Sequence, residues 1–171
     1  MSGPRILIAG IGNIFLGDDA FGVEVARRLS SREWADGVRV ADFGIRGFDL
    51  AYALLDHYDA AILVDATSQG GDPGTVYTIE LECGGENEEP KAVGMETHGM
   101  NPMRVLEMVH ALVGRPKRIL VVGCEPETFG DQEEGALGLS ATVEAAVDVA
   151  IGVIERLVAK IGCEPRAGVP A

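Results

Sequence analysis

The sequence has few cysteines and no long apolar run. Its three cysteines, Cys83, Cys124 and Cys163, are odd in number and far apart among 171 residues. They therefore form neither a disulfide framework nor a two-by-two zinc pattern, and we interpret them as reduced thiols. No segment approaches the roughly 18 apolar residues that a membrane-spanning helix needs, and the first residues carry no signal-peptide pattern. The sequence predicts a soluble, cytoplasmic protein without membrane insertion.

Positive charge is also scarce. Lysine and arginine together number 14 against 27 aspartates and glutamates, which gives a formal net charge of −13. Such a chain repels a phosphate backbone, so nucleic acid is not an expected partner. The acidic surface is compatible with a basic patch on a protein partner, but it serves solubility equally well.

Several common catalytic motifs are missing. The sequence contains no His-Glu-x-x-His zinc motif and no Gly-x-Ser-x-Gly nucleophile elbow, which removes the usual basis for a metalloprotease or serine hydrolase. The pair Glu107 and His110 has the spacing of di-iron bundle ligands but occurs once. A dinucleotide loop fails because its third glycine position is Phe15, and because Asp18 and Asp19 oppose a pyrophosphate. No organic cofactor is expected.

What the sequence does contain is one folded domain over residues 1–171, with 47% hydrophobic residues and 23 glycines. Apolar runs and alternation predict five strands: Arg5–Gly10, Val38–Phe43, Ala60–Asp65, Thr75–Glu82 and Lys117–Cys124. Helical spacing predicts four helices: Asp18–Ser31, Phe48–Asp56, Asn101–Gly114 and a last helix that Ser140 caps and Gly162 follows. A long loop, Cys83–Met100, contains His98, and about residues 163–171 form a flexible tail.

This order of elements predicts an α/β fold. Strands that are apolar on both faces belong inside a parallel sheet covered by helices. The alternating segment 75–82 is typical of an edge strand, so one antiparallel edge is plausible. We expect a three-layer αβα sandwich around a mostly parallel, twisted sheet of about five strands.

Three residues stand where such a sheet binds ligands, beyond the carboxyl ends of its strands. Asp65 ends an apolar strand, Asp19 begins a helix, and His98 precedes one. Each has a structural alternative: Asp18 and Asp19 can complement a helix dipole, Asp65 can cap a turn, and His98 can be a surface histidine. Together, two carboxylates and an imidazole suit a borderline divalent metal.

Cys124 also ends a predicted strand and is a candidate nucleophile. Free cysteine is commonly a small core residue, and we favour that inert interpretation.

Six segments, in this order, resemble a known family. They are GIGNIFLGDDAFGVEV (10–25), FGIRGFDL (43–50), ILVDA (62–66), ETHGMNP (96–102), VVGCEPE (121–127) and GLSATVEAAV (138–147). The family is that of the hydrogenase maturation endopeptidases, whose fold is phosphorylase/hydrolase-like and which trim the C-terminus of the [NiFe]-hydrogenase large subunit.

The resemblance implies that Asp19, Asp65 and His98 are the catalytic and metal-binding residues, with Asp19 where the family often has glutamate. It also implies that a set of residues lines the substrate cleft: Asn13, Gly44, Arg46 and Gly47. The nickel belongs to the substrate, the precursor of the large subunit, and the protease uses that ion to recognise the cleavage site.

Two other functions stay open from the sequence. One is a metal-dependent hydrolase that carries its own ion at the same three residues. The other is a non-catalytic binding module or chaperone that docks on the nickel subunit without cutting it.

Overall fold

The computed structural model describes residues 3–81, 115–131 and 133–164. Its strands are β1 (Ile6–Ile11), β2 (Val38–Gly44), β3 (Ala60–Ala66), β4 (Val76–Leu81) and β5 (Arg118–Cys124). Its helices are a 3-10 turn η1 (Gly17–Ala20), α1 (Phe21–Ser30), α2 (Gly47–Leu54) and α4 (Ala141–Cys163). The predicted helix 101–114, the loop 83–100 with His98, and residues 165–171 of the predicted tail lie outside the described residues.

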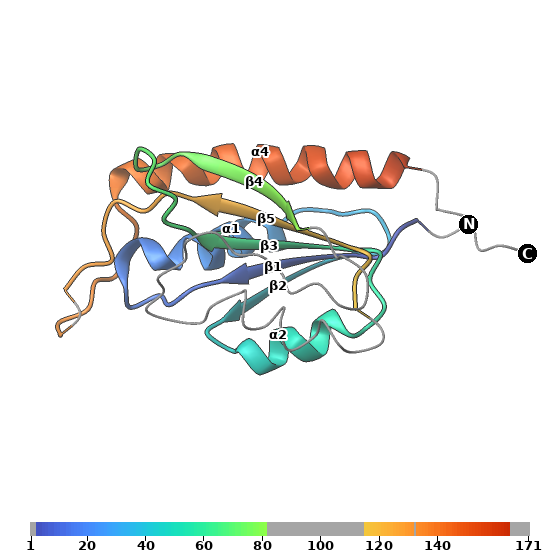
Figure 1. Cartoon of the computed structure of the whole chain (residues 1–171), viewed down its shortest axis with the longest axis horizontal. Helices are drawn as coiled ribbons and strands as arrows, with labels where there is room; N and C mark the ends of the chain where they lie inside the picture. Colours follow the sequence, from blue (N-terminus) through green and yellow to red (C-terminus); the bar gives the residue numbers. More distant parts are fainter. Residues whose placement is uncertain (1–2, 82–114, 132, 165–171) are drawn as a thin grey trace, which may run out of the picture.

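All five strands form one sheet in the order β2-β1-β3-β5-β4 (Figure 1). The pairs β1–β2, β1–β3 and β3–β5 are parallel, whereas β4 pairs with β5 in the antiparallel sense at the edge. The prediction of a mostly parallel sheet with one antiparallel edge strand is confirmed.

Helices cover both faces of this sheet. α1 and α4 pack on one face and α2 packs on the other, so the layers are helix, sheet and helix (Figure 1). Successive residues of β3 face opposite layers: Ile62 and Val64 join the cluster under α1 and α4, and Leu63 joins the cluster under α2. Burial on both sides explains why β3 is apolar almost throughout.

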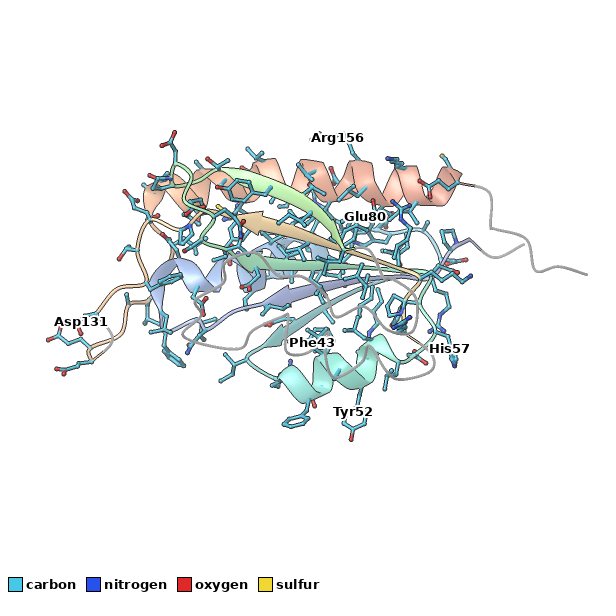
Figure 2. All side chains as sticks on the ribbon, in the orientation of Figure 1. Phe43, Tyr52, His57, Glu80, Asp131 and Arg156 are labelled. Carbon is cyan, nitrogen blue, oxygen red and sulfur yellow. The ribbon has the colours of Figure 1, made fainter. Side chains whose placement is uncertain are left out.

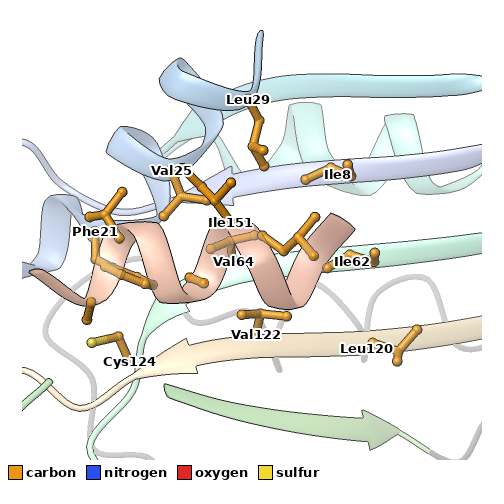
Figure 3. Packing of buried hydrophobic residues seen from close by; sticks show 14 of the residues in the cluster. Ile8, Phe21, Val25, Leu29, Ile62, Val64, Leu120, Val122, Cys124 and Ile151 are labelled. Carbon is orange, nitrogen blue, oxygen red and sulfur yellow. The ribbon is translucent and has the colours of Figure 1, made fainter. Parts of the chain in front are cut away.

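The larger core lies between the sheet and the pair α1 and α4 (Figure 3). Phe21, Val25 and Leu29 recur along α1 at intervals of four residues and face the strands, and Ile151 of α4 packs beside them. On the other face Phe43 is buried under α2, whereas Tyr52 on the outer side of α2 is 75% exposed (Figure 2).

Helix α4 begins where the sequence predicts but ends slightly later. Ser140 is the N-cap as expected, and its Oγ accepts a hydrogen bond from the Val143 N–H at 3.3 Å. The helix, however, continues through Gly162 to Cys163 instead of ending before this glycine. Among the helices in the described ranges, none is long and apolar enough to span a membrane.

Candidate active site

The strands β1, β3 and β5 are parallel, so their carboxyl ends lie at the same end of the sheet. The chain that leaves β1 folds back over this end (Figure 1). Gly22 makes this possible at the start of α1. A Cβ on Gly22 would lie 2.0 Å from the Val64 carbonyl oxygen and 2.4 Å from that of Ile11. Without a side chain at this position, α1 begins directly against the ends of β1 and β3.

A second close approach positions Asp19. Gly12 has a φ of +145°, and a Cβ there would lie 1.8 Å from the Asp19 carbonyl oxygen, so only glycine fits. The Asn13 backbone N–H donates a hydrogen bond of 2.8 Å to Asp19 Oδ2. The loop after β1 thereby holds the Asp19 carboxylate beside the end of the strand.

Asp65 lies near enough to Asp19 for the charge of Asp19 to act on its carboxyl. Asp65 is the sixth residue of β3, is 3% exposed, and follows Leu63 on the face that α2 covers. Burial, together with the charge of nearby Asp19, raises the pKa of Asp65 well above its ordinary value, against the opposing effect of the Ala66 N–H. Burial also raises the pKa of Asp19, and the Asn13 N–H opposes it. Two coupled carboxylates with raised pKa values are typical of a functional site.

Asp18 has a different role from the dipole partner that the sequence suggests. It is fully buried, and its Oδ2 accepts hydrogen bonds from the N–H groups of Glu127 and Thr128 at 2.8 and 2.9 Å. Ser140 donates to the same carboxylate through its N–H at 2.7 Å and its hydroxyl at 3.0 Å. Asp18 therefore fixes the loop after β5 and the start of α4 against η1, which is a structural role.

The four predicted cleft residues lie at the same end of the sheet, in the loop after β1 and in the connection from β2 to α2. These two segments are joined by a hydrogen bond of 3.0 Å from the Gly12 N–H to the Gly44 carbonyl oxygen, and Asn13 follows directly. Gly47 begins α2 and Arg46 is its N-cap. The Arg46 guanidinium donates to the carbonyl oxygens at the end of β2 and forms an exposed ion pair with Asp49. In this arrangement Arg46 supports its own loop.

Cys124 lies on the opposite face of the sheet from Asp65, inside the cluster under α1 and α4 (Figure 3). Burial, with the charges of Asp18 and Glu125, raises the pKa of this thiol to about 12. A buried thiol that keeps its proton is a poor nucleophile, so the structure supports the inert interpretation.

Glu125 is a buried acid that the sequence reasoning missed. It follows β5 and is 6% exposed, and its Oε2 accepts hydrogen bonds from the Gln69 N–H and the Tyr77 hydroxyl, both at 2.7 Å. Burial opposes its ionisation, but these bonds hold the pKa of Glu125 below its usual value. The hydrogen bond from the Tyr77 hydroxyl to Glu125 raises the pKa of Tyr77 to about 12. Glu125 thus anchors the loop after β3. Its position directly after a buried strand is the sequence feature that could have marked it as a candidate.

The predicted metal site depends on three residues, of which the structure describes two. Asp19 and Asp65 supply carboxylates, the donor type that suits divalent ions along with imidazole. The third predicted ligand, His98, lies outside the described residues. Within residues 3–81, 115–131 and 133–164, no group of three or more histidine, cysteine or acidic side chains could hold a metal ion.

Comparison with known proteins gives a consistent result. A sequence model of the family "hydrogenase maturation protease" matches residues 23–157. The hydrogenase expression/formation protein HupD of Rhizobium leguminosarum is 32% identical over 93% of this chain and 76% of its own length. The protein HoxM of Azotobacter vinelandii is 31% identical over 95% of this chain and 76% of its own length.

Solved structures show the same similarity in three dimensions. The hydrogenase maturating endopeptidase HybD from E. coli superimposes with a TM-score of 0.73 at 28% identity, covering 92% of this chain and 94% of its own. A [NiFe] hydrogenase maturation protease from Thermococcus kodakarensis gives a TM-score of 0.64 at 26% identity, covering 92% of this chain and 94% of its own.

Proposed function

Because the chain belongs to the hydrogenase maturation protease family, we propose that it removes the C-terminal extension from the nickel-loaded precursor of a [NiFe]-hydrogenase large subunit. The observation that carries this proposal is the pair Asp19 and Asp65. They are distant in sequence, yet the charge of Asp19 acts on the Asp65 carboxyl at the carboxyl end of the parallel strands. As a family member the protein is an endopeptidase, and a hydrolase needs polar groups of this kind where its substrate binds.

Nickel enters this proposal as part of the substrate. Asp19, Asp65 and His98 complete the coordination of the ion that the precursor carries, because carboxylate and imidazole donors suit a borderline divalent metal. An ion held there polarises the scissile carbonyl or activates water for attack. The precursor that presents its nickel correctly is thereby the one that is cut.

The general base in this scheme is one of the two carboxylates. A carboxylate beside a second carboxylate has a raised pKa, and a pKa nearer to the working pH improves general base catalysis. The directions found for Asp19 and Asp65 support this assignment.

The proposal is tested by replacing Asp19, Asp65 and His98 singly with alanine and incubating each variant with nickel-loaded precursor. Each replacement should slow removal of the C-terminal fragment by about a hundredfold or more. Asp56→Ala is the matched control, since this exposed carboxylate pairs with Arg5 at the opposite end of the strands. Mass spectrometry of the large subunit measures the cut.

Normal processing by all three variants would show that the site is wrong. If the wild-type protein binds the precursor and leaves its mass unchanged, the protein is a binding module rather than a protease. Stoichiometric metal that copurifies with the protein would instead favour a hydrolase with an ion of its own.

A further inference from the structure

Thr67 lies on the same face of the sheet as Asp65. Its backbone N–H donates to the Cys124 carbonyl oxygen at 2.9 Å, which continues the parallel ladder between β3 and β5 by one residue. Residues two apart on an extended strand project from the same face. The Thr67 side chain, which is 3% exposed, therefore lies next to Asp65 along the strand.

The Thr67 hydroxyl also lies beside Gly123 of β5, the residue opposite Asp65. Gly123 is the residue that pairs with Asp65, and a Cβ on it would lie only 2.2 Å from Thr67 Oγ1. The hydroxyl thus occupies the space that a side chain at position 123 would fill. Since neighbouring strands are about 4.8 Å apart, the hydroxyl lies next to Asp65 along the strand, beside the position that pairs with it.

The Thr67 hydroxyl has no hydrogen-bond partner among the residues that the structure describes. A buried hydroxyl without a partner is costly, and native proteins satisfy such groups with water or a ligand. A buried water needs at least two polar partners, and Thr67 Oγ1 and the Asp65 carboxylate, two residues apart on the same face of the sheet, can supply two.

We propose that Thr67, together with Asp65, binds the water molecule that hydrolyses the peptide bond. This inference rests on the proposed function. The water oxygen adds to the scissile carbonyl carbon, and one of its protons passes by way of Asp19 or Asp65 to the amide nitrogen. The C–N bond then breaks, which leaves a new carboxyl group and a free amine.

Thr67→Val and Thr67→Ser test this role as a pair. Valine keeps the shape and removes the hydroxyl, so it should lower kcat about tenfold to a hundredfold and leave KM unchanged. Serine keeps the hydroxyl and should retain kcat within about threefold. Thr75→Val is the control, because the Thr75 hydroxyl donates to the Asp72 carbonyl oxygen in a turn after β3 and should not affect processing.

Thermal unfolding separates this role from a structural one. Thr67→Val removes a hydroxyl that forms no hydrogen bond with the described residues, so the variant should melt at the wild-type temperature or above it. Wild-type kcat in Thr67→Val would overturn the inference. An equal loss of kcat in Thr67→Ser would overturn it too, because the hydroxyl would then not be the cause.

Crystal structures of the wild type and of Thr67→Val distinguish failure of this inference from failure of the proposed function. A water within hydrogen-bond distance of Thr67 Oγ1 and the Asp65 carboxylate, lost in the variant, supports the water-binding role even if no precursor is cut. A Thr67 hydroxyl that bonds to another protein group and binds no water contradicts it.

Discussion

At the scale of single residues, the buried carboxyl of Asp65, a proposed site residue, has a cost in stability. Folding places this carboxylate in a buried position near the charge of Asp19, and both effects raise its pKa well above 3.8. A group whose folded pKa is raised contributes most to stability below its unfolded pKa, and this contribution is lost as the pH rises. Asp65 therefore makes the folded protein less stable at neutral pH than in mild acid.

Asp65→Asn should remove this cost. We expect the variant to be more stable than the wild type at pH 7, since each unit by which the pKa is raised corresponds to about 1.4 kcal/mol. The gain should shrink as the pH falls towards 3.8 and level off below it, where the wild-type carboxyl becomes protonated in both the folded and the unfolded state. Thermal unfolding from pH 4 to pH 8 measures this, with Asp56→Asn as the exposed control; a variant less stable than wild type at pH 7 would refute the account.

Asp18 and Asp19 show why residue roles are hard to predict from sequence. They are adjacent in the same turn, yet Asp18 accepts bonds from residues 127, 128 and 140, whereas Asp19 accepts one from Asn13. The partners of Asp18 are more than a hundred positions away in sequence, and no local pattern reveals them. The family resemblance marks Asp19 as a site residue, and this assignment stays a prediction.

At the scale of elements, α1 positions the site through one glycine. Gly22 allows the start of α1 to contact the backbone at the ends of β1 and β3. This contact determines how far the preceding turn η1, and with it Asp19, lies from β3. A side chain at position 22 would have to displace the helix, because the atoms that it meets belong to the backbone.

Gly22→Ala should therefore destabilise the protein by about 1–3 kcal/mol through overpacking, and it should reduce processing because Asp19 moves. Gly152→Ala is the matched control within α4. A Cβ there meets first the flexible end of Arg156, at 3.4 Å, so alanine should stabilise the helix by about 0.5–1 kcal/mol. Urea unfolding of both variants compares them, and equal stability of Gly22→Ala and wild type would contradict this account of α1.

At the scale of the whole molecule, the fold could be predicted because each strand and helix has its own pattern of apolar residues within a short segment. The run Ala60–Asp65 is apolar on both faces, which indicates an interior parallel strand, and β3 lies at the centre of the sheet. The alternation in 75–82 indicates an edge, and β4 is the antiparallel edge. The sequence did not reveal the loop contacts of Glu125, or that the Thr67 hydroxyl has no hydrogen-bond partner within the described part of the chain, since both depend on how distant segments meet.

The dependence of cleavage on nickel is tested most simply with two preparations of the same large-subunit precursor, one loaded with nickel and one without it. Mass spectrometry after incubation with the wild-type protein measures removal of the C-terminal fragment. We expect the nickel-loaded precursor to be cut and the nickel-free precursor to stay intact, because in the proposed mechanism the ion binds to Asp19, Asp65 and His98. Equal processing of both preparations would contradict it.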